Sequence, residues 1–349
     1  MTNAVQTGRP TLLRTKRQGS LAAAAGWVVV AVLVIAFPAL HNVYFLYLAT
    51  LVAINVIGAT GLNLTVGYAG ILSIGHSAFM GVGAYVGALM MLYLGTPLLL
   101  NIVVGALAAF LVGLVFAIPA LRIKGVFLAV ATLAAQFMLY FIFRQWGAVT
   151  GGDRGLTLPV TNIFGLGDVG FYYFTVLLAA LLCLFCRNLF RTRVGRAFIA
   201  VRERDYAATV LGIDVVRTKL LAFGLGAAYA GVAGVLNSMY LRVVNPEQFT
   251  LTVSIFFLAA IIVGGRASIL GSILGAAFMT LMPEALRLLL DAGGAATGRD
   301  LIAVTSPLRE LVFGVMIVAF LMFEPRGLMG FYERLRGRAE VLGAEAEVH

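Results

Sequence analysis

Ten apolar runs, each close to the length of a membrane-spanning helix, constrain the fold of this chain more than any other feature. A helix needs about 20 mainly apolar residues to cross the hydrocarbon core of a bilayer. Of the 349 residues, 61% are hydrophobic and only 11% are charged, which suits lipid rather than water as the solvent. The runs lie near residues 21–40, 43–64, 76–94, 98–121, 125–143, 171–187, 219–241, 251–263, 269–290 and 307–323. We therefore expect an all-α, polytopic transmembrane helix bundle of about ten spans, with eight as the alternative.

Two of these segments depart from a simple helix pattern. The run 251–263 is short, which is typical of a broken or tilted helix. The stretch 67–75 is rich in glycine and predicts an interruption or a re-entrant turn between two spans. Irregular backbone at membrane depth is tolerated where it is buried in protein or lines a wet cavity.

The distribution of basic residues predicts the orientation. With the N-terminus in the cytoplasm, the inside segments hold 19 of the 25 Lys and Arg residues. This bias favours an even number of spans with both termini cytoplasmic, and it explains the net charge of +10 without a nucleic-acid partner. The expected organisation is a disordered cytoplasmic tail at 1–20, a transmembrane domain at 21–330 and a second cytoplasmic tail at 331–349.

The inside loop 188–218 carries a helical pattern of its own. Alanine, valine and leucine residues alternate with Arg202, Glu203, Arg204 and Asp205, and Gly212 closes the run as a helix C-terminus often does. The loop therefore predicts a short amphipathic helix in the cytoplasm. Its apolar side needs the membrane surface, its own bundle or a partner protein to cover it.

Motifs for enzymatic chemistry are missing from the sequence. There is no phosphate-binding Gly-x4-Gly-Lys-Ser/Thr loop, and no nucleophile or metalloprotease motif. The three histidines lie far apart, so we expect no metal site and no cofactor. Cys183 and Cys186 sit in an apolar run and are expected to pack there. Uphill transport by such a chain would take its energy from a partner or from an ion gradient.

Charged residues are scarce within the expected spans. Glu284 is the only carboxylate well inside one of them, which disfavours a proton- or sodium-driven carrier. Uncharged polar residues do occur there, among them Asn55, Ser77 and Gln136. For these we expect interhelical hydrogen bonds.

Six stretches, in the same order along the chain, carry a family resemblance. They are Gly61–Tyr85, Leu121–Leu133, Thr150–Leu156, Arg193–Ile213, Ile262–Gly275 and Phe323–Leu328. Together they resemble the permease family of the ABC importers for branched-chain amino acids, which comprises LivH-like and LivM-like subunits. Three of them, Leu121–Leu133, Thr150–Leu156 and Arg193–Ile213, are similar to the LivM type.

The resemblance implies a division of labour. A LivM-like subunit pairs with a LivH-like permease in the bacterial inner membrane, two ATPase subunits bind on the cytoplasmic side, and a periplasmic binding protein delivers the solute. The segment that would couple to the ATPases holds Arg196, Arg202, Glu203, Asp205, Ala207, Ala208 and Gly212. Tyr206 stands where ABC importers generally have a glutamate, so an ion pair of that glutamate is not expected here.

Two further sets of residues are candidates. For the solute path they are Asn63, Ser73, Gly75 and His76, and for docking of the binding protein they are Asp153, Arg154, Arg242 and Glu247. Importers of urea, short amides or aromatic acids in the same family stay open as alternatives. A channel or secondary carrier acting alone, and a membrane scaffold that transports nothing, are alternatives of other classes.

Overall fold

The structure is a computed structural model, and it describes part of the chain. The described residues are 37–38, 42–120, 126–160, 166–297, 311, 314–315, 318, 322 and 327–330. The described residues from Leu48 onward belong to one compact unit, and the contacts reported below lie within it. Most of the expected spans 21–40 and 307–323, and the expected tails 1–20 and 331–349, lie outside the described residues.

Eight helices in the described part are long and apolar enough to cross a membrane. Each corresponds to one of the runs expected from the sequence, and the all-α polytopic bundle is confirmed. The helices are α2 (Val43–Leu62), α3 (His76–Leu94), α4 (Leu98–Ala120), α5 (Val126–Gln145), α7 (Gly167–Leu189), α10 (Val215–Leu241), α11 (Leu251–Gly264) and α12 (Ile269–Thr297). The span that contains α11 reaches the required length only together with the turn before it and runs over Pro246–Gly264. The orientation of the termini stays a prediction.

Both irregular segments expected from the sequence are present. Helix α2 continues into a π-helical turn, η1 (Asn63–Tyr68), and residues 69–75 have no regular structure before α3 begins. Helix α11 has 14 residues and follows a 3-10 turn, η3 (Pro246–Phe249). The interrupted backbone is largely buried in protein, as the lipid environment demands.

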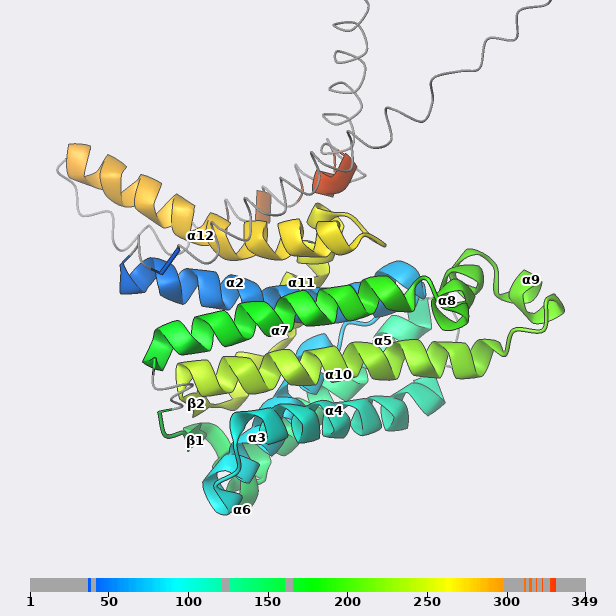
Figure 1. Cartoon of the computed structure of the whole chain (residues 1–349), viewed down its shortest axis with the longest axis horizontal. Coiled ribbons are helices and arrows are strands. Elements are labelled where there is room, and N and C mark those ends of the chain that lie inside the picture. Colours follow the sequence, from blue (N-terminus) through cyan, green and yellow to red (C-terminus); the bar gives the residue numbers. More distant parts are fainter. Residues whose placement is uncertain are drawn as a thin grey trace, which may run out of the picture. The chain divides into compact units, whose positions relative to one another are not determined.

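Short elements mark the two ends of the spans. Helices α8 (Arg193–Glu203) and α9 (Asp205–Val210) lie together at one end of α7 and α10, and α6 (Gly147–Thr150) and two short strands lie at the other (Figure 1). Strands β1 (Leu156–Thr157) and β2 (Val243–Val244) pair antiparallel, with Leu156 opposite Val244. Strand β1 belongs to the loop after α5, which also contains the 3-10 turn η2 (Gly152–Arg154), and β2 follows α10. The strand pair therefore joins these two loops.

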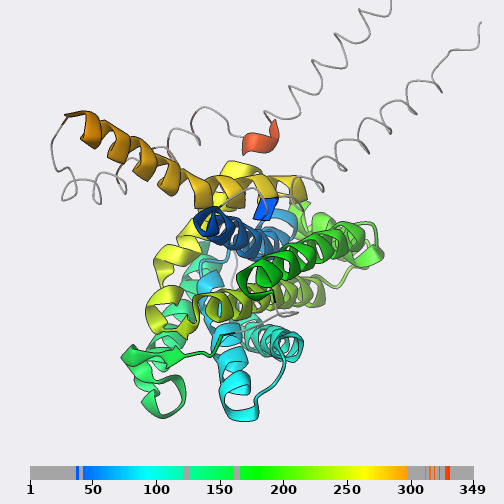
Figure 2. The ribbon, with the colours of Figure 1, turned by 60° about the vertical axis from the view of Figure 1, so that its left-hand side comes forward.

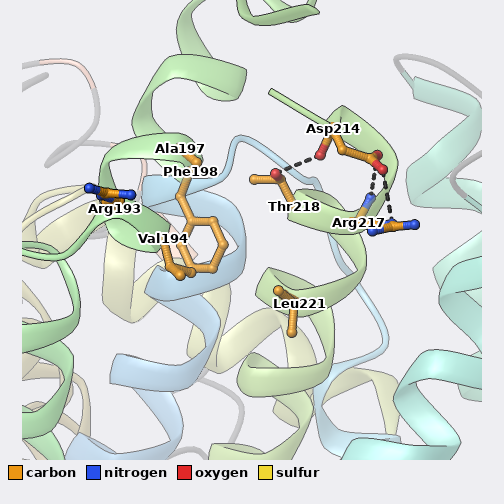
Figure 3. A pocket seen from close by; sticks show the side chains of 8 residues that line it. All are labelled: Arg193, Val194, Ala197, Phe198, Asp214, Arg217, Thr218 and Leu221. Atoms are coloured by element: carbon orange, nitrogen blue, oxygen red, sulfur yellow. Dashed lines mark hydrogen bonds and ion pairs between the residues drawn. The ribbon is translucent and has the colours of Figure 1, made fainter. Parts of the chain in front are cut away.

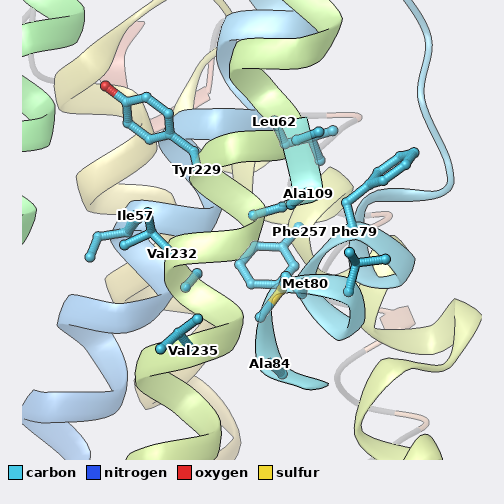
Figure 4. Packing of buried hydrophobic residues seen from close by; sticks show 14 of the residues in the cluster. Ile57, Leu62, Phe79, Met80, Ala84, Ala109, Tyr229, Val232, Val235 and Phe257 are labelled. Atoms are coloured by element: carbon cyan, nitrogen blue, oxygen red, sulfur yellow. The ribbon is translucent and has the colours of Figure 1, made fainter. Parts of the chain in front are cut away.

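Helix α10 lies at the centre of the packed core. It makes its most extensive contacts with α4 and α3, and side chains of α2, α3, α4 and α11 meet around it (Figure 4). Glycines allow this close approach: a Cβ on Gly83 of α3 would overlap the backbone of Gly231 in α10, and a Cβ on Gly231 would lie 2.6 Å from the Cβ of Ala109 in α4. Gly83 is thus a packing residue.

The outer faces of the spans suit lipid. On α4 the side chains of Leu107, Leu111 and Val115 are more than half exposed, one turn after another along the helix. Helix α12 lies beside α2 (Figure 2), and the Nδ2 of Asn55 donates to the Oγ1 of Thr280 at 3.0 Å. This bond confirms the interhelical role expected for Asn55.

Candidate functional site

The loop 188–218 folds into two helices rather than the single one that the sequence predicted. Thr192 caps α8, since its Oγ1 accepts a hydrogen bond from the backbone of Gly195 at 3.4 Å. Arg204 has extended backbone with φ −156° and separates α8 from α9. Gly212 has φ +80° and ends the run at the position expected for a helix-terminating glycine.

Helix α9 presents an apolar surface outside the spans. Tyr206 is 84% exposed, Val210 72% and Leu211 76%, and Ala207 is exposed between them in sequence. We call Tyr206, Ala207, Val210 and Leu211 the α9 patch. Ala208, by contrast, is 1% exposed and belongs to the side of α9 that packs on its own chain. The two alanines predicted for one contact therefore lie in different environments.

Polar contacts tie this segment to the bundle. The Nζ of Lys219 in α10 lies 2.5 Å from the Oδ2 of Asp205. The Nη1 of Arg196 donates to the carbonyl of Arg191 at 2.9 Å, and the guanidinium of Arg202 pairs with Glu203 at 3.2 Å. The contacts of Arg196 and Arg202 lie within the segment itself. The ion pair between Lys219 and Asp205 joins the segment to α10 and so fixes the orientation of α9.

A groove of about 230 Å³ separates α8 from the start of α10 (Figure 3). It is lined by Arg193, Val194, Ala197, Phe198, Asp214, Arg217, Thr218 and Leu221. At one edge Asp214 caps α10 by accepting from the backbone of Arg217, and it also pairs with the side chain of Arg217 at 3.0 Å. Phe198 is fully buried, so the groove has an apolar wall beneath α8.

The residues expected to line the solute path are all buried. Asn63 donates from Nδ2 to the carbonyl of Ser268 at 2.8 Å and to the Oγ of Ser272 at 2.7 Å, and its Oδ1 accepts from the backbone of Ala267 at 2.9 Å. Each polar atom of this amide is therefore used to join η1 to the start of α12. A path through this position would have to open these bonds.

The other three candidates contact different elements. The Nε2 of His76 lies 2.9 Å from the carbonyl of Gly58 in α2, and its ring meets that of Phe257 edge-on. A Cβ on Gly75 would lie 2.5 Å from the carbonyl of Thr132 in α5, so only glycine fits there. Ser73 is 4% exposed. The structure therefore distributes the four residues over several contacts and does not gather them in one site.

A polar network at the start of α3 was only partly foreseen. The Oε1 of Gln136 accepts from Ser77 Oγ at 3.0 Å, from the backbone of Ala78 at 3.0 Å and from Ser254 Oγ at 3.2 Å. Its Nε2 donates to the carbonyl of Phe249 at 2.7 Å. The interhelical bonds expected for Ser77 and Gln136 are confirmed. Ser254 was missed, because a lone serine in an apolar run gives no sequence signal.

The β1–β2 pairing brings together the two loops that carry the candidates for docking of the binding protein. Asp153 pairs with Arg144 at 2.7 Å, and Arg242 pairs with Asp168 at 3.2 Å across the ends of α10 and α7. Arg154 is exposed beside Asp153. The sequence did not indicate Arg144 or Asp168, which are the partners of two of the candidates.

Glu247, the fourth docking candidate, follows strand β2. It lies exposed on η3, three residues after β2, whose pairing with β1 holds the two loops together. The end of the spans that carries β1 and β2 therefore presents acidic and basic side chains from both loops, a mixture that suits electrostatic recognition of a protein surface.

The sequence of the chain matches a known protein family and several curated proteins. Residues 44–321 match the family described as branched-chain amino acid transport system, permease component. The chain is 30% identical over 329 residues to the high-affinity branched-chain amino acid transport system permease protein LivM of Escherichia coli, covering 86% of this chain and 74% of that one.

Permeases of both types from an archaeon also match. The probable LivM protein of Methanocaldococcus jannaschii is 26% identical, covering 77% of this chain and 88% of that one. The probable LivH protein of the same organism is 29% identical, covering 78% of this chain and 87% of that one. No solved structure matches the chain.

Proposed function

Because this multi-pass membrane protein belongs to the branched-chain amino acid transport permease family, we propose that it is the LivM-like membrane subunit of an ATP-driven importer of leucine, isoleucine and valine. Its relatives include both LivM and LivH permeases, which supports a membrane pair of two different subunits. The chain acts in the bacterial inner membrane and is itself not an enzyme. ATP is hydrolysed by two separate ATPase subunits, and a periplasmic binding protein delivers the solute.

The α9 patch is the observation that carries the proposal. Its side chains are largely apolar and exposed on a helix that is not one of the spans, so the bundle itself does not cover them. A partner protein that buries Tyr206, Val210 and Leu211 gains roughly 25 cal/mol for each Å² of apolar surface removed from water. A groove on an ATPase subunit is the partner that a permease without a nucleotide loop requires.

The mechanism is alternating access driven from this contact. Closure of the ATPase dimer on ATP moves the α9 patch, and Asp205 and Arg202 pass the movement to the bundle through their bonds to α10 and η1. Small Ala207 allows close approach of the partner, and Gly212 allows the turn into α10. Arg196 and Glu203 are exposed at the rim of the contact, while Ala208 anchors α9 to the bundle.

The solute path is proposed to pass the interrupted backbone between η1 and α3. Asn63, Ser73, Gly75 and His76 line it in the conducting state, after the bonds that bury them here have opened. A weakly polar lining suits a hydrophobic amino acid, because the binding protein supplies the selectivity. Asp153, Arg154, Arg242 and Glu247 are proposed to dock that protein.

A stand-alone carrier is the alternative of another class. Ion-coupled carriers use carboxylates within the membrane. Glu284 is available for this role only in part, since its side chain is 15% exposed and lies 2.9 Å from Arg287 in the next turn of α12. The ion pair with Arg287 supports a structural role for Glu284. Importers of urea, short amides or aromatic acids differ from the main proposal in the solute alone.

Two measurements test the proposal together. The tagged chain is purified from its native membrane and the co-purified subunits are identified, and uptake of labelled leucine, urea and a short amide is measured in cells lacking the gene. We expect ATPase subunits and a second permease in the complex, with loss of leucine uptake that the gene restores. A chain that purifies without ATPase subunits would contradict the importer, and loss of another label alone would correct the solute.

A matched pair of variants locates the ATPase contact. Leu211→Asp places a charge in the α9 patch, and we expect the ATPase subunits to be lost during purification. The control is Leu211→Met at the same position, which keeps an apolar side chain of similar size and should retain the ATPase subunits. Retention of the ATPases by Leu211→Asp would move the contact elsewhere.

A further inference from the structure

We propose that Arg202 is a positioning residue that links the cytoplasmic segment to the π-helical turn η1, and that η1 passes the movement of α8 to the α11–α12 connection. This inference rests on the proposed function, because it assigns the route by which ATPase movement enters the membrane domain. It assigns to Arg202 a role inside the bundle in place of a contact with the ATPase surface.

The first contact of this route joins α8 to the end of η1. The Nη1 of Arg202 donates to the carbonyl of Gly67 at 2.8 Å, across 135 positions of sequence. Carbonyls in the last turn of a helix lack partners within the helix, and an arginine supplies a charged donor for one of them. Arg202 is therefore a C-terminal cap for η1 that comes from another element.

The stem of Arg202 also contacts the segment after η1, although 37% of its side chain is exposed. Gly70, with φ +68°, lies directly against it: a Cβ at this position would be 2.9 Å from the Cγ of Arg202. The ring of Tyr68 stacks on that of Phe190 at the end of α7, with centroids 3.6 Å apart and an interplanar angle of 17°. The end of η1 thus contacts Arg202 in α8 and Phe190 just before α8, so a shift of α8 would act directly on it.

The second contact joins η1 to the α11–α12 connection. Asn63, the first residue of η1, holds Ala267, Ser268 and Ser272 through three hydrogen bonds of 2.7–2.9 Å. Gly67 is close to the same connection, since a Cβ there would lie 2.7 Å from the backbone nitrogen of Ala267. One residue of η1 therefore touches both Arg202 and the connection, which makes the route continuous.

The geometry of η1 suits an element that changes state. π-Helical turns are rare and occur mostly as single turns inserted in α-helices at functional sites. Here the backbone of Ala69 bonds the carbonyl of Leu64 at 3.2 Å, five residues back. A turn that is wider than an α-helix and capped from outside can rewind when its cap moves. Small shifts are amplified where a packed element has two discrete arrangements.

The test compares Arg202→Gln with Arg204→Gln in the full importer, reconstituted with both permeases, the ATPase subunits and the binding protein. Arg204 is exposed two residues away and matches the lost charge. The readout is the number of leucine molecules imported for each ATP hydrolysed. We expect Arg202→Gln to lower this ratio at least 5-fold with the ATPases still bound, Arg202→Lys to restore part of it, and Arg204→Gln to leave it unchanged.

Hydrogen exchange of the same complexes supplies a second readout. Arg202→Gln should speed amide exchange in residues 63–72 and 265–272 and nowhere else in the described spans. An unchanged import ratio for Arg202→Gln would overturn the route while leaving the importer intact. Loss of the ATPase subunits from Arg202→Gln would also overturn it, since the residue would then be a docking residue. A wild-type complex that imports none of the labelled solutes would overturn the proposed function and the route with it.

Discussion

The ammonium group of Lys219 lies 2.5 Å from the Oδ2 of Asp205 and ties the first residue of α9 to the first turns of α10. Lys219 is only 20% exposed, and Asp205 is 39% exposed, so the pair is partly shielded from solvent. Since α9 is only six residues long, it has little stability of its own and depends on such contacts. The pair therefore fixes the direction in which the α9 patch faces.

Replacing Lys219 by methionine should weaken the hold on the ATPase subunits. Ion pairs near a protein surface contribute up to about 1 kcal/mol, so for this partly shielded pair we expect the ATPases to dissociate roughly 5-fold faster from nanodisc-embedded complexes. The control is Arg217→Met, which removes a pair that is 84% exposed on the arginine side and does not involve α9. Equal dissociation rates for the two variants would show that the Lys219–Asp205 pair does not orient the patch.

The neighbouring alanines of α9 should respond differently to the same substitution. Ala207 is exposed, so Ala207→Trp should fold and assemble but separate ATP hydrolysis from uptake. Ala208 is 1% exposed, and Ala208→Trp should prevent folding because the bundle has no room for the ring. Size-exclusion chromatography in detergent and uptake assays measure the two effects. Normal uptake by Ala207→Trp would exclude this face of α9 from the contact.

The spans were predictable because length and apolarity alone decide them. Helix α3 begins and ends where the sequence predicted, at His76 and Leu94, and Gly95 with φ +61° terminates it. The π-helical turn was not predictable, since Asn63–Tyr68 reads as a continuation of an apolar helix. Its geometry depends on hydrogen bonds to Ala267 and Ser268, about 200 residues away.

In the candidate site, too, features that depend on neighbouring residues were predictable and features that depend on distant contacts were not. The helical pattern and the terminating Gly212 were visible in the sequence, because they depend on neighbouring residues. The break at Arg204 and the inward direction of Arg202 were not, because each depends on how α8 meets the bundle. Sequence likewise predicted that Gln136 would make an interhelical hydrogen bond but could not supply Ser254 as a partner.

Removal of the Gln136 amide should destabilise the bundle strongly. Gln136→Leu leaves the backbone N–H of Ala78 without this partner in a buried site. It also removes one of several partners of Ser77, of Ser254 and of the carbonyl of Phe249. An unsatisfied buried polar group costs about 1–3 kcal/mol, so we expect a loss of roughly 3 kcal/mol in unfolding free energy. Phe137→Leu, at the exposed neighbouring position, is the control. Denaturation in mixed detergent micelles measures both, and equal stability would mean that the network is not needed.

Charge reversal at Arg154 should slow the arrival of the binding protein. Arg154 is exposed at the end of the spans that is proposed to dock the binding protein. The structure describes no ion pair for its side chain, so Arg154→Glu changes the surface charge without breaking a described ion pair. Electrostatic attraction acts mainly on association, and we expect the association rate of the loaded binding protein to fall about 10-fold at low salt.

Screening distinguishes this effect from a change of shape. The Debye length falls to about 3 Å at 1 M salt, so the rates for Arg154→Glu and for the wild type should converge there. Arg204→Glu makes the same charge change at the opposite end of the spans and should leave the rate unaltered at every salt concentration. A difference that persists at 1 M salt would mean that Arg154 acts through direct packing. No difference at low salt would remove it from the docking surface and leave Arg242 and Glu247 as the residues to test next.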